Sequence, residues 1–297
     1  MTKPKVLVIG SMNMDLVTQT NKVPKVGDTV LGTSFFTIPG GKGANQAVAA
    51  SKLGANVTML GCVGDDAFGQ ELKQNLSDQG VTIDYIKTIP NTSSGIASIT
   101  LSQGDNSIIV VPGANQELTP DMVRENEKII ADSDIILLQL EIPLESVKTS
   151  MELAIKHNVP VVLNPAPIQS LPKDLLLQAT YITPNEHEQK TLILNDELTS
   201  EEKELIKQKC IVTQGSQGVL LYQNTEELIP GYKVKAVDST GAGDTFNGAL
   251  AVSLSKGIAL KEACQFANAA AALSVTKLGA QSGMPSLEEV EKFMAQV

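Results

Sequence analysis

The chain of 297 residues contains only two histidines and three cysteines. With His157 and His187 as its only imidazoles, it lacks the ligands for a histidine-rich metal site and offers little to a Ser-His-Asp hydrolase. Cys62, Cys210 and Cys264 lie far apart, in apolar or helical surroundings. This pattern argues against structural zinc and indicates reduced core thiols, as expected for a cytoplasmic protein.

Basic clusters and long apolar runs are also missing. The net charge is −10, and the sequence contains no cluster of basic residues, which argues against nucleic-acid binding. The N-terminal residues have no signal-peptide pattern, and no apolar segment is long enough to cross a bilayer. We therefore expect a cytoplasmic protein that has neither nucleic acid nor membrane as a partner. An enzyme of this charge that handles anions must concentrate positive potential locally.

Two common phosphate-binding motifs are absent. The run 241–246 begins with G-x-G, but Phe246 stands where a dinucleotide fingerprint needs its third glycine. The run 41–46 fails at the same place, since it has Gln46 there. No G-K-[ST] sequence occurs, so a Walker-type P-loop is excluded and any nucleotide must be held in another way.

The sequence does have the pattern of an α/β protein. Its apolar content of 42% is sufficient for a large core. Apolar runs typical of buried strands alternate with helical spacing, and they fall at residues 5–9, 57–63, 135–141, 159–163 and 180–183. We therefore expect one α/β domain over residues 1–297, with a mainly parallel central sheet flanked by helices.

Two stretches, at about residues 12–39 and 95–112, differ from this pattern. They alternate polar and apolar residues around turns, which is typical of antiparallel strands with one face in solvent. We expect them to form a small antiparallel β lid outside the main sheet, placed to exclude water from a reaction.

The sequence DSTGAGD, at residues 238–244, is the main candidate for chemistry. Residues 234–237 have strand composition and residues 245–255 have helical spacing, so its glycines are predicted to lie at a strand-to-helix turn. Gly241 and Gly243 would let a phosphate approach the free amides of the helix start. Asp244 could then act as a base toward an attacking hydroxyl. A capping acid beside a glycine turn is the alternative, and the two acids that bracket the turn favour phosphate chemistry.

Polar residues near two other turns are candidates for binding a ligand. In PGGKGANQ, at residues 39–46, Lys42 and Asn45 lie beside glycines at the start of a predicted helix, although a flexible loop would have a similar composition. Asn13 and Asp15 are two apart after the first strand, so they suit vicinal hydroxyls and a turn equally well. Glu141 ends an apolar run at the expected ligand-binding edge, but this segment alone favours a surface acid.

Three later segments have the composition of a nucleotide site. Asn185 and Glu188 offer oxygen atoms to magnesium through water, or form a helix N-cap with an acid that compensates the helix dipole. The sequence TQGSQG, at residues 213–218, suits phosphates or a simple hairpin. The alanine-rich run 267–272 suits close helix packing or a flat adenine.

These segments, together with GSMNMD at residues 10–15, resemble the ribokinase (PfkB) family of carbohydrate kinases, and they occur along the whole chain. The two glycine-rich segments resemble the two signature patterns of that family. The resemblance implies the ribokinase-like three-layer fold and ATP-dependent phosphorylation of D-ribose at its 5-hydroxyl, giving ribose 5-phosphate and ADP. It also implies Mg²⁺ and K⁺ as cofactors, and a homodimer formed through the lid sheets.

The resemblance further implies roles for single residues. Asp244 would be the catalytic base, next to an anion hole made by Gly241, Ala242 and Gly243. The sugar would contact Asn13, Met14, Asp15, Gly41, Lys42, Gly43, Ala44, Asn45 and Glu141. The nucleotide would contact Asn185, Thr213, Gln214, Gly215, Ser216, Gln217, Gly218, Gly243 and Asn268.

Metal binding is implied in the same way. Glu188 would support magnesium through water. The monovalent cation would be held, mostly by backbone carbonyls, at Asp238, Thr240, Ser274, Lys277, Gly279 and Gly283. The family often has a serine where this chain has Gly283, preceded here by Ser282, so that ligand is lost, replaced by water or supplied by the neighbour.

Two alternative functions are open at this point. A kinase of the same fold could act on another sugar or on a nucleoside, in the manner of a fructokinase or an adenosine kinase. A nucleoside would require aromatic stacking, for which the lid offers only Phe35 and Phe36. A non-catalytic sugar-binding protein would not need Asp244 and its glycines, which are intact.

Overall fold

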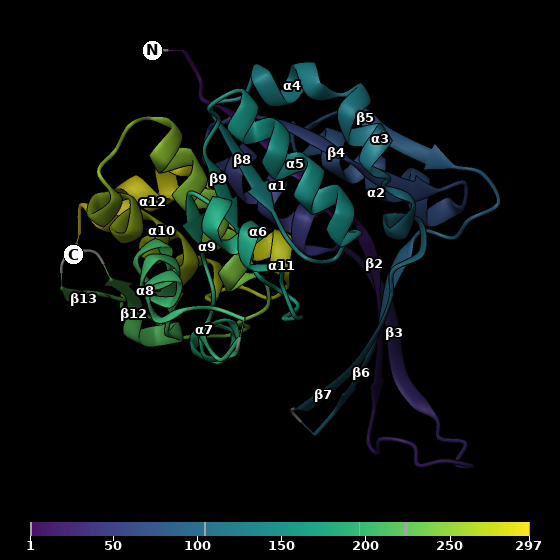
Figure 1. Ribbon diagram of the computed structural model, residues 1–297. Coiled ribbons are helices and arrows are strands. Elements are labelled where there is room, and N and C mark those ends of the chain that lie inside the picture. Colours follow the sequence, from purple (N-terminus) through teal and green to yellow (C-terminus); the bar gives the residue numbers. More distant parts are fainter. Residues whose placement is uncertain (1, 104, 196, 223–224, 297) are drawn as a thin grey trace.

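The computed structural model describes residues 2–103, 105–195, 197–222 and 225–296, and a six-stranded sheet lies at its centre (Figure 1). All neighbouring strands in this sheet are parallel, as predicted. The order is β10 (Tyr181–Ile182), β9 (Val161–Leu163), β8 (Ile135–Leu138), β1 (Lys5–Ile9), β4 (Asn56–Gly64) and β5 (Thr82–Ile89). Three strands are shorter than the apolar runs that predicted them, and β8 ends three residues before Glu141.

Helices cover both faces of this sheet because side chains alternate along each strand. Val6 and Val8 of β1 belong to one buried cluster, and Leu7 and Ile9 belong to the other. The first cluster includes residues of α1 (Lys42–Lys52), α2 (Ala67–Asp78), α9 (Ala242–Ser255), α10 (Leu260–Ser274) and α12 (Leu287–Met294). The second includes residues of α3 (Pro120–Glu125), α4 (Glu127–Ala131), α5 (Leu144–Lys156), α6 (Lys173–Gln178), α7 (Glu186–Ile193) and α8 (Ser200–Lys209). The predicted three-layer architecture is confirmed.

The predicted lid is a separate four-stranded sheet that projects from the body (Figure 1). Its order is β3 (Gly32–Gly40), β2 (Asn13–Thr20), β6 (Gly95–Ser102) and β7 (Asp105–Val111). The pairs β2/β3 and β6/β7 are antiparallel, as expected. The two hairpins meet through a parallel pair, β2 with β6, which the sequence pattern did not indicate. A lid of this kind is anchored to the body at one end only.

A third sheet extends the structure beyond β10. It contains β11 (Ile211–Thr213), β12 (Gly218–Tyr222) and β13 (Glu226–Pro230), all antiparallel. The strand, glycine turn and strand predicted for residues 210–222 are therefore confirmed. Single parallel bridges, Ile182 with Cys210 and Asn185 with Thr213, connect this sheet to the central one.

The strand predicted at residues 234–237 is wrong. This segment is irregular, because it runs beside a helix end and has no strand as a neighbour. The amides of Val237 and Asp238 donate to the carbonyl of Val275 instead, at 2.7 and 3.1 Å. The glycine turn at 241–243 therefore joins an irregular segment, not a strand, to α9.

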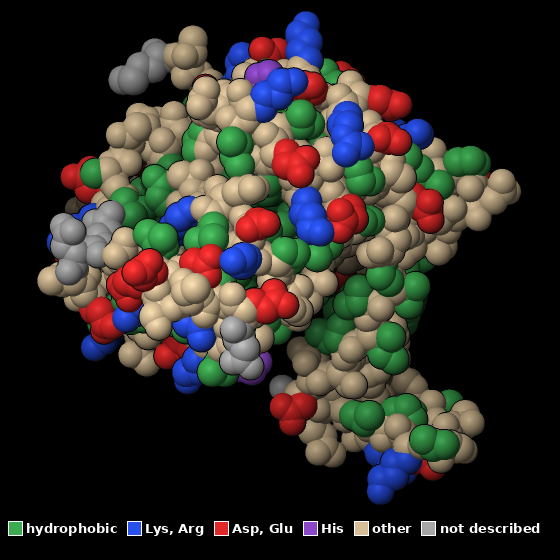
Figure 2. Space-filling model, in the orientation of Figure 1, with side chains coloured by type: hydrophobic (Ala, Val, Ile, Leu, Met, Phe, Trp, Pro, Cys, Tyr) green, Lys and Arg blue, Asp and Glu red, His purple; other side chains and the backbone are tan. Residues whose placement is uncertain are grey.

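The surface and the short elements complete the fold. Two 3-10 helices, η1 (Gly113–Glu117) and η2 (Gly215–Gln217), and the short helix α11 (Ala280–Gly283) lie in connecting segments. On the face shown in Figure 2, acidic and basic side chains are interspersed. No helix within the described ranges combines the length and the apolar character needed to cross a membrane.

Candidate functional site

The first turn of α9 presents free amide groups beside a buried acid. Gly241 adopts φ 77°, a left-handed conformation that favours glycine, and α9 begins directly after it. The amides of Gly241, Gly243 and Asp244 have no acceptor within the described part of the chain, whereas that of Ala242 donates to the carbonyl of Ser239 at 3.2 Å. Free amides at a helix start are suited to holding a phosphate.

The carboxylate of Asp244 is held in place by two amides from α1. Asn45 Nδ2 donates to Oδ2 at 3.0 Å, and Gln46 Nε2 donates to Oδ1 at 3.1 Å. The helices approach closely at Gly248, where an added Cβ would lie 2.7 Å from that of Ala49. The glycine in α9 therefore allows the amides of α1 to reach the acid. Gln46 was not assigned a role from the sequence, although it adjoins Asn45.

Two further acids face the same space as Asp244. Burial, reinforced by the charges of Glu141 and Asp244, raises the pKa of Asp15 to about 7. Burial also raises the pKa of Asp244, against the opposing effects of Lys42 and of the two amides. The Asp15 carboxylate lies beside Gly40, that of Glu141 accepts from the amide of Lys42, and that of Asp244 accepts from Asn45, so all three lie around the start of α1 and offer acceptors for hydroxyl groups.

Glu141 is fixed by the start of α1. Its carboxylate accepts a hydrogen bond from the hydroxyl of Ser11, and its Oε2 accepts one from the amide of Lys42 at 3.0 Å. Glu141 therefore lies beside the other residues predicted to bind the sugar. It is at the carboxyl edge of the central sheet, where its position after an apolar run predicted it. Ser11 was missed in the sequence, because a single serine after a strand is a common residue in a common position.

Asn13 lies at the base of the lid and is only 3% exposed. Its Oδ1 accepts from Asn115 Nδ2 at 2.8 Å, while Asn115 Oδ1 accepts from the amide of Met12 at 2.9 Å. Asn115 thereby orients the side chain of Asn13. It was not predicted, because it is about a hundred residues away in the sequence and only the fold brings it near.

The other residues predicted to contact the sugar offer backbone only. The side chains of Met14 and Ala44 lie in the core. Gly41, with φ 90°, immediately precedes α1. A Cβ at Gly43 would lie 2.5 Å from the amide nitrogen of Ser11, so glycine is required for α1 to approach β1.

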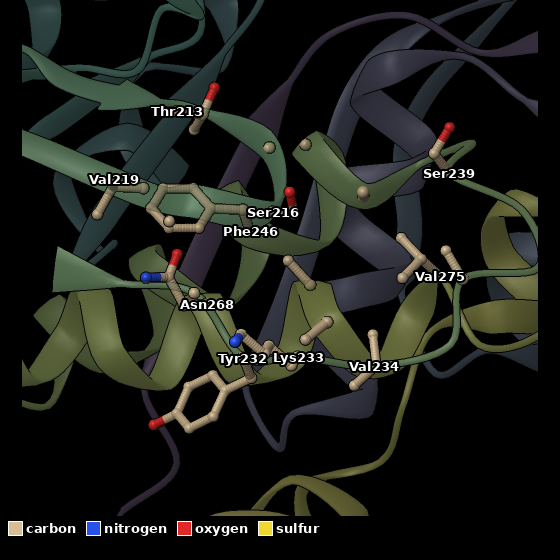
Figure 3. A pocket seen from close by; sticks show the side chains of 18 residues that line it. Thr213, Ser216, Val219, Tyr232, Lys233, Val234, Ser239, Phe246, Asn268 and Val275 are labelled. Atoms are coloured by element: carbon tan, nitrogen blue, oxygen red, sulfur yellow. The ribbon is translucent and has the colours of Figure 1, made fainter.

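A cavity of about 680 Å³ lies on the other side of the start of α9. Of the residues predicted to contact nucleotide, those that line it are Thr213, Gly215, Ser216, Gly218, Gly243 and Asn268. Figure 3 shows Thr213 and Val219 at one side and Ser239 and Val275 at the other. The volume and the mostly apolar lining suit a nucleotide whose phosphates point toward Gly243.

Three of the predicted nucleotide contacts do not line this cavity: Asn185, Gln214 and Gln217. Asn268 does line it, but its Nδ2 donates to the carbonyls of Ile229 and Pro230, at 3.1 and 3.2 Å. That amide nitrogen therefore secures the end of β13, and only the oxygen is left for a ligand.

Asn185 and Glu188 form a capping box at the start of α7. Asn185 Oδ1 accepts from the amide of Glu188 at 2.9 Å, and Glu188 Oε2 accepts from the amide of Asn185 at 2.8 Å. Burial raises the pKa of Glu188, and the hydrogen bond from the amide of Asn185 and the charge of Lys42 oppose it. Lys42, at the start of α1, therefore favours the ionised form of both Glu188 and Asp244.

These residues fit a magnesium ion that is bound mainly by a nucleotide. No group of three or more histidine, cysteine or acidic side chains that could hold a metal occurs within the described ranges. Glu188 has one oxygen beyond its capping bond. Magnesium characteristically keeps several waters and binds phosphates together with one or two carboxylates, so a single carboxylate acting through water is sufficient.

The predicted monovalent-cation segment folds into a compact loop around Asp238. This carboxylate accepts from the amides of Thr240 and Gly279, both at 2.9 Å. Its partial burial alone would raise its pKa, but these hydrogen bonds and the hydroxyl of Thr240 outweigh that effect and lower it.

Backbone carbonyls converge next to this loop. A Cβ at Gly283 would lie 2.5 Å from the carbonyl oxygen of Ser274 and 3.6 Å from that of Lys277. Glycine is therefore required at this position, and the two carbonyl oxygens are ligands of the kind that a potassium ion prefers. The hydroxyl of Ser282 donates to the carbonyl of Leu278 at 2.6 Å, so it already has a partner.

The chain is similar to known proteins over nearly its whole length. The model of the pfkB family of carbohydrate kinases matches residues 3–287. The chain is 50% identical to a ribokinase from Bacillus subtilis, over 98% of this chain and 99% of that protein. A ribokinase structure from Thermotoga maritima has a TM-score of 0.88 at 39% identity, covering 98% and 99% of the two chains. An Arabidopsis thaliana ribokinase complexed with ribose and ATP has a TM-score of 0.90 at 34% identity, covering 99% of each chain.

Proposed function

This chain belongs to the pfkB family of carbohydrate kinases, and we propose that it transfers the γ-phosphoryl group of ATP to the 5-hydroxyl of D-ribose. One observation carries this proposal. Asp244 lies between a space lined by acids and a cavity of nucleotide size, at a helix start with free amides. A base at this boundary can act on a sugar hydroxyl that faces a nucleotide phosphate.

The sugar is held on the side of the three acids. Asp15 and Glu141 accept hydrogen bonds from its hydroxyls, and Asn13, oriented by Asn115, presents its amide nitrogen. The lid strands β2 and β3 begin beside this space, and we propose that they close over the bound sugar and exclude water from it. Burial of the site strengthens each of these interactions.

The groups at the start of α9 act directly on the reacting atoms. The 5-hydroxyl oxygen attacks the γ-phosphorus, the bond from that phosphorus to the β–γ bridging oxygen breaks, and ADP leaves. Asp244 takes the hydroxyl proton, and its raised pKa makes it a better base than an exposed carboxylate. The amides of Gly241 and Gly243, with the charge of Lys42, stabilise the oxygens of the phosphoryl group in the transition state of its transfer.

We further propose that the reaction uses both magnesium and potassium. Magnesium, when bound, neutralises the nucleotide phosphates, and Glu188 supports it through water. Potassium would be held by the carbonyls of Ser274 and Lys277 beside the loop of Asp238. Three buried free cysteines agree with a reducing compartment such as the cytoplasm.

The lid also suggests a homodimer. Phe35 of β3 is 63% exposed and Ile109 of β7 is 68% exposed, so the lid has apolar side chains that the described parts of the chain leave uncovered. We propose that the lid sheet of a second copy covers them. Sedimentation velocity should give a dimer for the native protein and a monomer for Ile109→Asp. A native protein that is monomeric at micromolar concentration would contradict the proposal.

A panel of acceptors tests the function. ATP and magnesium are supplied with D-ribose, 2-deoxy-D-ribose, D-fructose or adenosine, in potassium and then in sodium buffer. We expect the highest kcat/KM with D-ribose, phosphorus NMR showing the product at the 5-position, and higher activity in potassium. Preference for fructose or adenosine would overturn the assignment. Tight ribose binding without product would indicate a binding protein.

A further inference from the structure

The two amides that hold Asp244 are themselves held by a second pair of amides. Gln281 Nε2 donates to Asn45 Oδ1 at 3.0 Å, and Gln139 Nε2 donates to Gln46 Oε1 at 2.6 Å. Asn45, Gln46, Gln139 and Gln281 are all buried. The acid is thus the end point of two hydrogen-bonded chains of carboxamides.

Such a chain fixes which end of each amide faces the acid. A carboxamide has a donor end and an acceptor end, and rotation by about 180° exchanges them at little steric cost. Asn45 presents Nδ2 to Asp244 only while its Oδ1 has a donor elsewhere. Gln281 is that donor, and its own Oε1 accepts from Asn75 Nδ2 at 2.8 Å.

Gln281 is well placed to hold this orientation. It lies in α11, is 7% exposed, and its backbone carbonyl accepts from Lys52 Nζ at 2.7 Å. Gln281 is therefore held by α1 through its backbone carbonyl and by α2 through its side-chain amide oxygen. Its side chain does not line the nucleotide cavity, and it is hydrogen-bonded to Asn45, not to Asp244.

We propose that Gln281 is a positioning residue for phosphoryl transfer: by donating to Asn45 it keeps the donor end of Asn45 on the Asp244 carboxylate. The inference rests on the proposed function, in which Asp244 is the base. Without this donor, Asn45 rotates, its oxygen faces the carboxylate, and the base loses one of its two hydrogen bonds. The ionised base is then less stable.

Gln281→Glu tests the proposal, because an ionised carboxylate at this position presents only acceptors and Asn45 would turn its nitrogen toward them. The other ionisable groups near Asp244 are Asp15, Glu141 and Lys42, and none of them is altered. We expect the acid limb of the pH profile of kcat/KM to move up by about one pH unit, since a hydrogen bond to a charged group is lost. The ribose Kd, measured by calorimetry above that limb, should stay within about twofold.

Two further variants make the result decisive. Gln281→Met removes the donor without adding charge, and it should move the acid limb in the same direction by a smaller amount, even if the glutamate variant folds poorly. Gln70→Glu makes the same chemical change at an exposed site on α2 and should reproduce the native profile.

The failures can be told apart. If the native protein does not phosphorylate ribose, the proposed function fails. If the native protein is active and Asp244→Asn is not, but both Gln281 variants have the native acid limb, the positioning role alone is refuted. A lower kcat in both variants with an unshifted limb would show that Gln281 acts only on the packing, and it would refute the role equally.

Discussion

Replacing Asp15 with asparagine should make the protein more stable at alkaline pH while it destroys activity toward ribose. Asp15 faces Glu141 and Asp244, and its carboxyl is close to the backbone at Gly40, where an added Cβ would lie 2.7 Å from Oδ2. The folded protein therefore holds a carboxylate in a place that disfavours its charge. Sites that bind ligands tightly are often unfavourable for the empty protein in this way.

The size of the effect follows from the pKa of Asp15, which is raised from 3.8 to about 7. This change corresponds to roughly 4 kcal/mol against the ionised form in the folded state. Between about pH 4 and pH 7 the folded protein binds a proton that the unfolded chain has lost, so stability falls as the pH rises through this window. Above pH 7 the penalty is complete. Allowing for new contacts of the amide, we expect a net gain of about 1–3 kcal/mol at pH 8 and less at pH 5.

Urea unfolding of both proteins at the two pH values measures this difference. The free energy of unfolding of Asp15→Asn should exceed that of the native protein at pH 8, and the gap should narrow at pH 5. In the same preparations, kcat/KM for ribose should fall by about 100-fold or more, because an acceptor for the sugar hydroxyls is gone. An equal gap at both pH values, or a less stable variant at pH 8, would refute the account of Asp15 as a strained acid.

Two glycine substitutions provide further tests. Gly43→Ala places a Cβ 2.5 Å from the amide nitrogen of Ser11, so α1 must move away from β1. We expect the free energy of unfolding, measured in urea, to fall by about 2–4 kcal/mol and ribose binding to weaken. A variant as stable as the native protein would contradict the close approach. Gly283→Ala places a Cβ 2.5 Å from the carbonyl oxygen of Ser274. We expect the variant to need more potassium for half-maximal activity and to bind ribose with the native Kd. An unchanged potassium titration would show that these carbonyls are not ligands of the cation.

Local patterns in the sequence predicted most of the framework. The run at residues 5–9 is a strand with the same bounds, because a continuous apolar stretch that is buried on both faces has few alternatives. The lid hairpins were recognisable from alternation around turns. The start of α9 was recognisable because a left-handed turn favours glycine, here Gly241, and helical spacing follows it in the sequence.

Other features depend on neighbours that are distant in the sequence. Residues 234–237 have strand composition, but strand propensity is expressed only where another strand offers a ladder, and here a helix end is adjacent. The parallel pairing of β2 with β6 is set by how two hairpins leave the body. Asn115 and Gln281 are ordinary amides in short helical turns, and only tertiary structure shows that they orient Asn13 and Asn45.

The most direct test is a single-turnover measurement with Asp244→Asn. Enzyme in excess over ATP is mixed with saturating ribose and magnesium, and phosphoryl transfer is followed beside a calorimetric titration of ribose. Our prediction is that the variant binds ribose within about tenfold of the native Kd, while transfer slows by at least about 10³-fold. Transfer at the native rate by a variant that cannot accept the hydroxyl proton would contradict it.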